Sequence, residues 1–204
     1  MSNAKFDALN VSRETMDRLE QFVDLVKKWT KAINLIAPGT VGDIWTRHIV
    51  DSAQVYHLAP DHWKTWTDIG SGGGFPGLVV AILDQKERQI TLIESDQRKC
   101  LFLKTVKREL GLNVSVEQVR IERAEVEPAD IVSARALSAL PSLLGACDQL
   151  LKHTGTAIFP KGGTFQEELD QARLHWQFDV VEHQSQTHQD GRVLEISRIQ
   201  RREP

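Results

Sequence analysis

The sequence is poor in the features that mark secreted, membrane and metal-binding proteins. Its 204 residues include two cysteines, Cys100 and Cys147, without metal-type spacing, and seven histidines that show none either. Such cysteines predict buried, reduced thiols rather than a disulfide framework or a zinc site. No apolar run approaches the length of a membrane span. The N-terminus lacks the apolar core of a signal peptide, so we expect a cytoplasmic protein with no membrane partner and no metal.

Neither sign of charge is in excess. The chain has 25 Lys and Arg against 28 Asp and Glu, a formal net charge of −3. This balance argues against a protein that coats nucleic acid non-specifically, although it permits a local basic face. With 41% hydrophobic and 26% charged residues, the composition is that of a globular chain long enough for one domain with a full core.

The first part of the chain is predicted to be helical. Ser12 is a suitable N-cap for a helix that continues at helical spacing to the sequence APG at 37–39, which ends it. A second helical pattern runs from Asp43 to His57. We therefore expect residues 1–63 to form a helical extension on an α/β domain of residues 64–204, the two together making one compact unit.

From residue 65 onward, short β-type runs alternate with helical ones, which predicts βαβ units around a parallel sheet. The helical runs include 96–110, closed by Gly111, and 139–152. The last two strands are joined by a turn that contains Asp190 and Gly191, which predicts an antiparallel hairpin. The expected strands are 65–69, 90–94, 114–119, 130–134, 156–159, 178–183 and 192–199.

Glycine is concentrated in one stretch, because DIGSGGGFPG at 68–77 holds five of the thirteen in the chain. Glycine costs backbone entropy on folding, so this density needs a reason. The stretch follows strand 65–69 and precedes a helix that begins near Pro76. In doubly wound folds, this is the corner where a ligand lies against bare backbone.

Two ligands fit the glycine stretch. From Gly72, GGGFPG matches the dinucleotide fingerprint G-x-G-x-x-G, and Glu94 lies near the spacing of the acid that binds a ribose. From Asp68, the order acid–x–Gly–x–Gly–x–Gly resembles motif I of the class I S-adenosylmethionine (AdoMet) methyltransferases, whose sheet also ends in an antiparallel hairpin. A carboxylate beside the loop suits a cationic cofactor. We favour AdoMet, and an NAD-dependent oxidoreductase is the alternative.

The flanking motifs make the resemblance more specific. Seven short segments carry it: AINLI, RHIVDS, DIGSGGGFPGL, LIESDQRKCLFL, RIE, SARAL and FPKG. They occur in an order and spacing that resemble those of the glucose-inhibited division protein B family. The resemblance covers residues 22–199. It implies a Rossmann-like class I methyltransferase fold, with a mostly parallel seven-stranded sheet, an antiparallel C-terminal hairpin and an N-terminal helical cap. It further implies AdoMet-dependent methylation of guanine N7 in 16S ribosomal RNA, at guanine-527 in the 530 loop.

The same resemblance implies where the cofactor lies. Asp68 would serve the methionine end and Glu94 the ribose, while Gly72 and Gly74 would leave room for the cofactor. An alternative register places the RIE motif three residues later, at Ala124 and Glu125. The residues expected to contact the cofactor directly are Gly70, Phe75, Ile121, Glu122 and Arg135.

The chemistry needs little catalytic machinery, because guanine N7 carries a free lone pair at neutral pH and attacks without prior deprotonation. Rate enhancement is expected mainly from positioning. We hypothesise that Arg135 holds O6 or a neighbouring phosphate and leaves N7 free. Arg47, His48 and Lys161 are further candidates for contact with RNA or with the active site, and Asp51 is expected to dock the helical cap. The RNA would be bound as 16S rRNA, a precursor particle or the 30S subunit. A non-catalytic rRNA assembly factor that contains AdoMet, or a methyltransferase of small molecules, stays open.

Overall fold

The computed structural model describes residues 9–84, 86 and 88–202. Its centre is a seven-stranded sheet in the order β3-β2-β1-β4-β5-β7-β6. All pairings are parallel except those of β7, which runs antiparallel to both β5 and β6. The expected class of sheet, with its terminal hairpin, is therefore confirmed. The strands are β1 (Thr65–Ile69), β2 (Gln89–Glu94), β3 (Val114–Gln118), β4 (Ala129–Ser133), β5 (Leu151–Lys161), β6 (Trp176–Gln184) and β7 (Arg192–Arg201).

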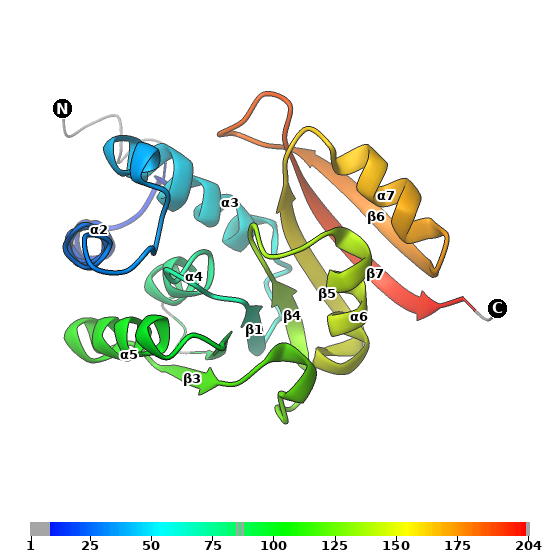
Figure 1. The fold of residues 1–204 in the computed structure, drawn as a ribbon, viewed down its shortest axis with the longest axis horizontal. Coiled ribbons are helices and arrows are strands. Elements are labelled where there is room, and N and C mark those ends of the chain that lie inside the picture. The colour runs from blue at the N-terminus through cyan, green and yellow to red at the C-terminus, as the bar shows by residue number, and fades with distance from the viewer. Residues whose placement is uncertain (1–8, 85, 87, 203–204) are drawn as a thin grey trace.

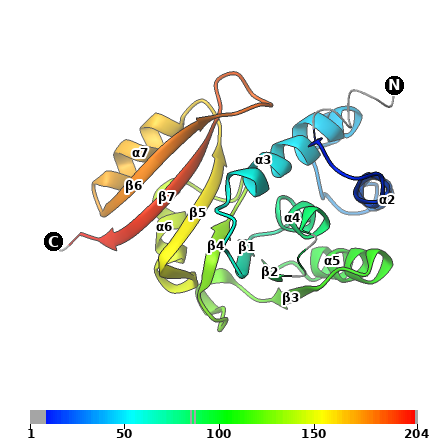
Figure 2. The same ribbon diagram turned by 180° about the vertical axis from the view of Figure 1, so that it is seen from behind.

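Helices cover both faces of the sheet (Figures 1 and 2). On one side α4 and α5 lie against the strands, with α2 packed outside them and α3 beside α4; α6 and α7 lie on the other side. Each face has its own apolar core, one built around Phe22, Trp66 and Phe102, the other around Leu144 and Phe159. The helices are α2 (Arg13–Trp29), α3 (Asp51–Leu58), α4 (Gly77–Leu83), α5 (Gln97–Leu110), α6 (Leu140–Leu150) and α7 (Phe165–Arg173), with short turns η1 (Pro38–Asp43), η2 (Trp45–Val50) and η3 (Ile121–Arg123).

The N-terminal segment begins as expected but ends its first helix early. The hydroxyl of Ser12 caps α2 by accepting a hydrogen bond from the Thr15 N–H. The helix stops at Trp29 rather than at 37–39. The Thr30 hydroxyl bonds to both backbone groups of Ile36, so the intervening chain closes into a loop. The apolar residues that extended the helical pattern are partly or fully buried in that loop.

The second predicted helix is also irregular. Its first turn, η2, is a π-helix, and regular α-helix begins only at Asp51. Single turns of π-helix are rare and occur frequently at functional sites. Here the wide turn carries Arg47 and His48. The N-terminal segment packs on the sheet through the same core that holds β1 and β2, so its position relative to the strands is fixed by burial.

Candidate functional site

The site lies where the carboxyl ends of β1 to β5 meet, beside the point at which the strand order reverses. β1 pairs with β2 on one side and with β4 on the other. The helix that follows β1, α4, and the helix that follows β4, α6, cover opposite faces of the sheet. This crevice is the usual ligand site of open α/β sheets. Two cavities open there, and five residues line both of them, namely Thr40, His48, Arg135, Ala136 and Leu137.

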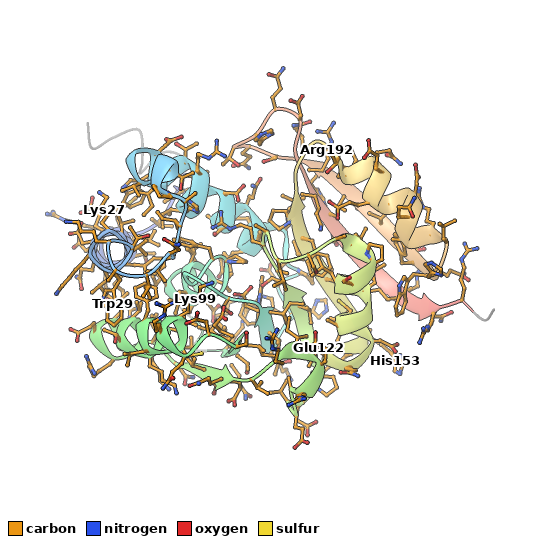
Figure 3. All side chains as sticks on the ribbon, viewed as in Figure 1. Lys27, Trp29, Lys99, Glu122, His153 and Arg192 are labelled. Carbon is orange, nitrogen blue, oxygen red and sulfur yellow. The ribbon has the colours of Figure 1, made fainter. Side chains whose placement is uncertain are left out.

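The first cavity, of about 610 Å³, is formed around the glycine stretch, and we call it the glycine-loop cavity. Gly70, Gly72 and Phe75 line it, and so do Glu94 and Arg135, which brings together five of the residues predicted to lie at the cofactor. Ile121 and Glu122 of η3 contribute at the far side, together with Lys99; Figure 3 labels Glu122 and Lys99 on the segments that follow β3 and β2. Ala124 and Glu125 are not among the lining residues.

Gly70 is a position at which the loop requires glycine. Its φ of +65° suits glycine, and a Cβ built there would lie 2.5 Å from Cδ1 of Leu137. Gly74 has a different role from the expected one. It does not line the cavity, and a Cβ there would lie 2.4 Å from Cδ1 of Leu78, so Gly74 makes room for α4 rather than for a ligand.

Asp68 supports the loop from below. Its side chain is fully buried; Oδ1 accepts a hydrogen bond from the Ser133 hydroxyl at 2.7 Å and Oδ2 one from the Gly77 N–H at 3.3 Å. Ser133 is its partner in the register of β1 with β4, which explains the short distance. Asp68 does not line the cavity, so its place differs from the expected contact with the methionine end of a cofactor.

Glu94 shapes the loop and also faces the cavity. At the end of β2, Oε2 accepts a hydrogen bond from the Gly72 N–H at 2.9 Å and Oε1 one from the Asp96 N–H at 2.8 Å. The residue is 8% exposed and lines the cavity. A carboxylate oxygen has two lone pairs and can accept a further bond from a hydroxyl. The group is therefore placed to hold a ribose.

The second cavity, of about 730 Å³, opens on the other side of the shared wall. It is bounded by η2, by the chain after β4, by the end of β5, and by the segment 185–192 that joins β6 to β7. Arg47 and Lys161 line it as expected. Lys161 is occupied, because Nζ donates to the Glu168 carboxylate at 2.7 Å and to the Ser138 carbonyl at 2.9 Å. Glu168 also accepts the Leu140 N–H.

Arg135 forms the centre of the shared wall and joins the N-terminal segment to the sheet. Nη1 donates to the Arg47 carbonyl at 2.9 Å and to the Asp51 carboxylate at 3.4 Å, and Nη2 donates to Nδ1 of His48 at 2.7 Å. The guanidinium carbon lies 5.0 Å from the centre of the Phe75 ring. We expected this arginine to hold the substrate, but much of its hydrogen-bonding capacity is used within the protein.

The hydrogen-bond partners of His48 determine which ring nitrogen donates and which accepts. A guanidinium only donates, so Nδ1 accepts and the ring proton is on Nε2. Nε2 therefore donates to the Thr40 hydroxyl at 2.8 Å, which in turn donates to the Ala37 carbonyl at 2.8 Å. His48 is 8% exposed. Burial, and next the charge of Arg135, lower its pKa to about 4, so the ring is neutral at physiological pH.

Asp51 docks the helical segment as expected, and it does so on two sides. Besides Arg135, it accepts a hydrogen bond from the Thr187 hydroxyl at 2.6 Å, and the Gln54 amide bonds to Oδ1 at 2.9 Å. Gln54 also accepts the Gln186 N–H at 3.1 Å. The segment between β6 and β7 is thus held against α3 at the rim of the second cavity.

The opposite pKa shifts of His48 and Asp68 lead to a testable pH dependence. Complete burial raises the pKa of Asp68 to about 6, and the hydrogen bond from Ser133 opposes that rise. For His48 the unfolded chain protonates first, so stability is lost as pH falls from 6.5 to 4. For Asp68 the folded chain protonates first, so stability is lost as pH rises from 3.8 to 6. At 1.36 kcal/mol per pKa unit, each effect is about 3 kcal/mol, and the two offset each other between about pH 4 and 6.

We therefore expect the His48→Asn variant to become less stable by about 3 kcal/mol as pH rises from about 4 to 6, relative to the shallow profile of the parent chain. Urea unfolding at half-unit pH steps measures this. The Asp68→Asn variant is the matched counterpart, and its stability should rise over the same interval. Parallel profiles for the parent and the His48 variant would contradict the assignment.

Thr40, Leu137 and Arg192 are among the residues of the site that were not predicted from the sequence. Thr40 lies in an irregular segment, and its role depends on its distance from His48. Leu137 lies within SARAL and is 39% exposed between the cavities, and a large apolar residue two positions after the candidate arginine was an available signal. It follows Ala136, whose φ of +52° is a strained conformation that places the loop over Gly70. Arg192 was predicted only as part of a strand.

Within the described part of the chain, no helix is long and apolar enough to cross a membrane. Over the same residues no group of three or more His, Cys, Asp or Glu side chains gathers as metal ligands would. Both cysteines are buried.

Comparison with known proteins gives consistent results. Residues 15–196 match the GidB family model, described as rRNA small subunit methyltransferase G. The chain is 47% identical to ribosomal RNA small subunit methyltransferase G of Ruegeria sp. (strain TM1040) over 95% of each chain, and 46% identical to the protein of that name from Rhizobium meliloti over 96% of this chain and 95% of that one.

Solved structures share the fold at low sequence identity. A ribosomal protein L11 methylase from Lactobacillus delbrueckii subsp. bulgaricus aligns with a TM-score of 0.60 at 18% identity, over 73% of this chain and 77% of that one. The T. thermophilus 16S rRNA N2 G1207 methyltransferase, solved with AdoMet and guanosine, aligns with a TM-score of 0.54 at 14% identity, over 76% of this chain and 40% of that one. These likenesses confirm the class I methyltransferase fold.

Proposed function

Because the chain belongs to the rRNA small subunit methyltransferase G family, we propose that it transfers a methyl group from AdoMet to N7 of a guanine in 16S ribosomal RNA. It is an AdoMet-dependent rRNA methyltransferase, and the family match decides between the two interpretations of the glycine stretch in favour of AdoMet. The observation that carries the proposal is that two cavities share a wall at the carboxyl edge of the sheet. A donor in one cavity can meet an acceptor base in the other at that wall.

The residues of the glycine-loop cavity fit AdoMet. Gly72 lines this cavity, and a Cβ built there would have only the Gly70 carbonyl oxygen within 4 Å, so a ligand can approach the backbone at that point. Glu94 supplies a carboxylate for the ribose hydroxyls, Ile121 supplies an apolar surface for the adenine, and Glu122 lies beside the base, all three lining one cavity. Asp68, fully buried beneath the loop, supports the loop instead of touching the ligand. When bound, AdoMet supplies an electrophilic methyl group on a sulfonium.

The protein's own contribution is to position the reactants. Guanine N7 attacks with a lone pair that is already free, so no residue has to remove a proton. Arg135, held by His48 and Asp51, fixes the wall through which the two cavities meet. Holding two reactants in line in this way contributes on the order of 7–11 kcal/mol to lowering the barrier. Leu137 places an apolar side chain at the junction, where it excludes water from the reacting atoms.

The test uses the purified protein, AdoMet with a labelled methyl group, and 30S subunits or 16S rRNA from a strain that lacks the family's enzyme. We expect one methyl group per rRNA molecule, at N7 of guanine-527. Mass spectrometry of nuclease fragments identifies the base and the position. AdoMet binding without methyl transfer to any of these RNAs would support the assembly-factor alternative and contradict the proposal. Comparing free rRNA, precursor particles and 30S subunits as substrates identifies which form the enzyme binds.

A further inference from the structure

The second cavity has a charge distribution that the mechanism above does not use. Four cationic side chains line it, against two carboxylates, whereas the whole chain has a net charge of −3. Two of the cations are neutralised locally, because Arg135 pairs with Asp51 and Lys161 with Glu168. The remaining two, Arg47 and Arg192, are not paired with an acid in any ion pair between described residues.

Arg192 is held in a conformation that leaves its N–H groups available. Its guanidinium carbon lies 5.3 Å from the centre of the Phe165 ring, so one face is against the aromatic ring. Nη1 donates only to the neighbouring Gly191 carbonyl, at 2.9 Å. An arginine stacked in this way presents a planar edge of donors, which suits the two oxygens of a phosphate. Figure 3 shows Arg192 at the start of β7, next to the segment that comes from β6.

The position of Arg192 carries an electrostatic cost. Arg192 is directly opposite Lys161 in the antiparallel pairing of β5 with β7, and like charges opposite each other destabilise a sheet. Glu168 offsets the charge of Lys161 but leaves that of Arg192. An anionic ligand in the second cavity would remove this cost.

Arg47 is the counterpart on the opposite side of the cavity. It is exposed on the π-helical turn η2, and its backbone carbonyl accepts the bond from Arg135. The backbone at this position is therefore fixed, and Arg47 lines the same cavity as Arg192. The two arginines come from the helical cap and from the terminal hairpin, so they bound the cavity from two sides.

We infer that Arg47 and Arg192 bind two backbone phosphates of the RNA, so that the nucleotide between them enters the second cavity. The inference rests on the proposed function and adds the way in which the substrate is held. Phosphate contacts fix the register of the RNA without reading its sequence. In this arrangement Arg135 is left to support the wall between the two cavities.

The experiment measures RNA binding and turnover for Arg47→Gln, Arg192→Gln and the double variant, with 30S subunits that lack the methyl group. Each single change should raise KM for the RNA about tenfold and reduce the slope of log K against log salt concentration by roughly 0.7–0.9, as for one phosphate contact. AdoMet affinity and kcat at saturating RNA should not change. Arg47→Lys and Arg192→Lys should restore the salt slope, because an ammonium also binds a phosphate.

Arg173→Gln is the matched control, because this arginine is 49% exposed at the end of α7, paired with Asp170 and outside the cavity. It should leave both KM and salt slope unchanged. If the glutamine variants keep the parent's salt slope while the parent methylates the RNA, the phosphate inference is wrong and the proposed function stands. If the parent transfers no methyl group, the proposed function fails first. Weaker AdoMet binding in the variants, with unchanged RNA binding, would also overturn the inference.

Discussion

The Gly70→Ala variant should bind AdoMet at least tenfold more weakly than the parent chain and lose methyl transfer in proportion. Gly70 has φ +65°, and a Cβ there would lie 2.5 Å from Leu137. A left-handed conformation costs an alanine about 1–2 kcal/mol. The added Cβ also displaces the side chain of Leu137, which is 39% exposed. Because Leu137 lines both cavities, its displacement alters the cofactor and substrate sides together.

Two other glycines separate these contributions. Gly111 has φ +61° and open space where a Cβ would lie, with no atom within 4 Å, so Gly111→Ala tests the backbone cost alone. Gly42 has neither a positive φ nor a close neighbour and lines neither cavity, so Gly42→Ala should behave as the parent does. Thermal unfolding and calorimetric titration with AdoMet measure all three. If Gly70→Ala loses stability as Gly111→Ala does but keeps full AdoMet affinity, the ligand does not lie at Gly70.

The order and type of the strands could be predicted from the sequence because each is short, apolar and bounded by turn residues. The boundary errors have local causes. β5 extends beyond 156–159 at both ends, because Leu151 pairs with β4 and because Pro160 and Lys161 pair with β7. The helix predicted to reach APG ends at Trp29, because Leu35 and Ile36 continue an apolar pattern while being buried in a loop. Apolar residues at helical spacing do not distinguish a buried helix from a loop with buried side chains.

The glycine-loop cavity was largely predictable, whereas the second cavity was not. The first is formed by consecutive motifs at the ends of neighbouring strands, so linear order locates them. The second combines η2, the chain after β4, the end of β5 and the segment 185–192. Nothing in the sequence pairs Thr187 with Asp51, a contact between residues 136 positions apart. Long-range polar contacts of this kind depend on how the helical cap sits on the sheet.

The roles of individual residues show the same limit. Asp68 and Gly74 belong to the motif that identifies the loop, yet both act on the protein's own structure, through Gly77 and Leu78 respectively. Some residues of a binding motif therefore serve the packing beneath the loop rather than the ligand. Arg135 lies at the mouth of the site, and much of its hydrogen-bonding capacity is used by His48 and Asp51, so its expected contact with the substrate stays a prediction.

Replacing Arg135 should therefore damage the protein's structure as well as its activity. The Arg135→Ala variant leaves the Asp51 carboxylate without its cation and Nδ1 of His48 without its donor. Breaking one partner of a buried pair costs about 3–5 kcal/mol. We expect a loss of stability of that order and a fall in methyl transfer of about a hundredfold or more. Arg135→Lys should restore little, because an ammonium cannot reproduce the planar fork that reaches all three acceptors.

A double-mutant cycle distinguishes support from substrate contact. If Arg135 acts through His48, the losses of stability in Arg135→Ala and His48→Ala should not add, with a coupling energy of about 1–3 kcal/mol in unfolding experiments without RNA. A residue that only held the substrate would show additive changes in stability and a higher KM for RNA. That second pattern would return Arg135 to the role of a substrate contact. The coupled pattern would instead establish that the wall between the two cavities is fixed by the protein before either ligand binds.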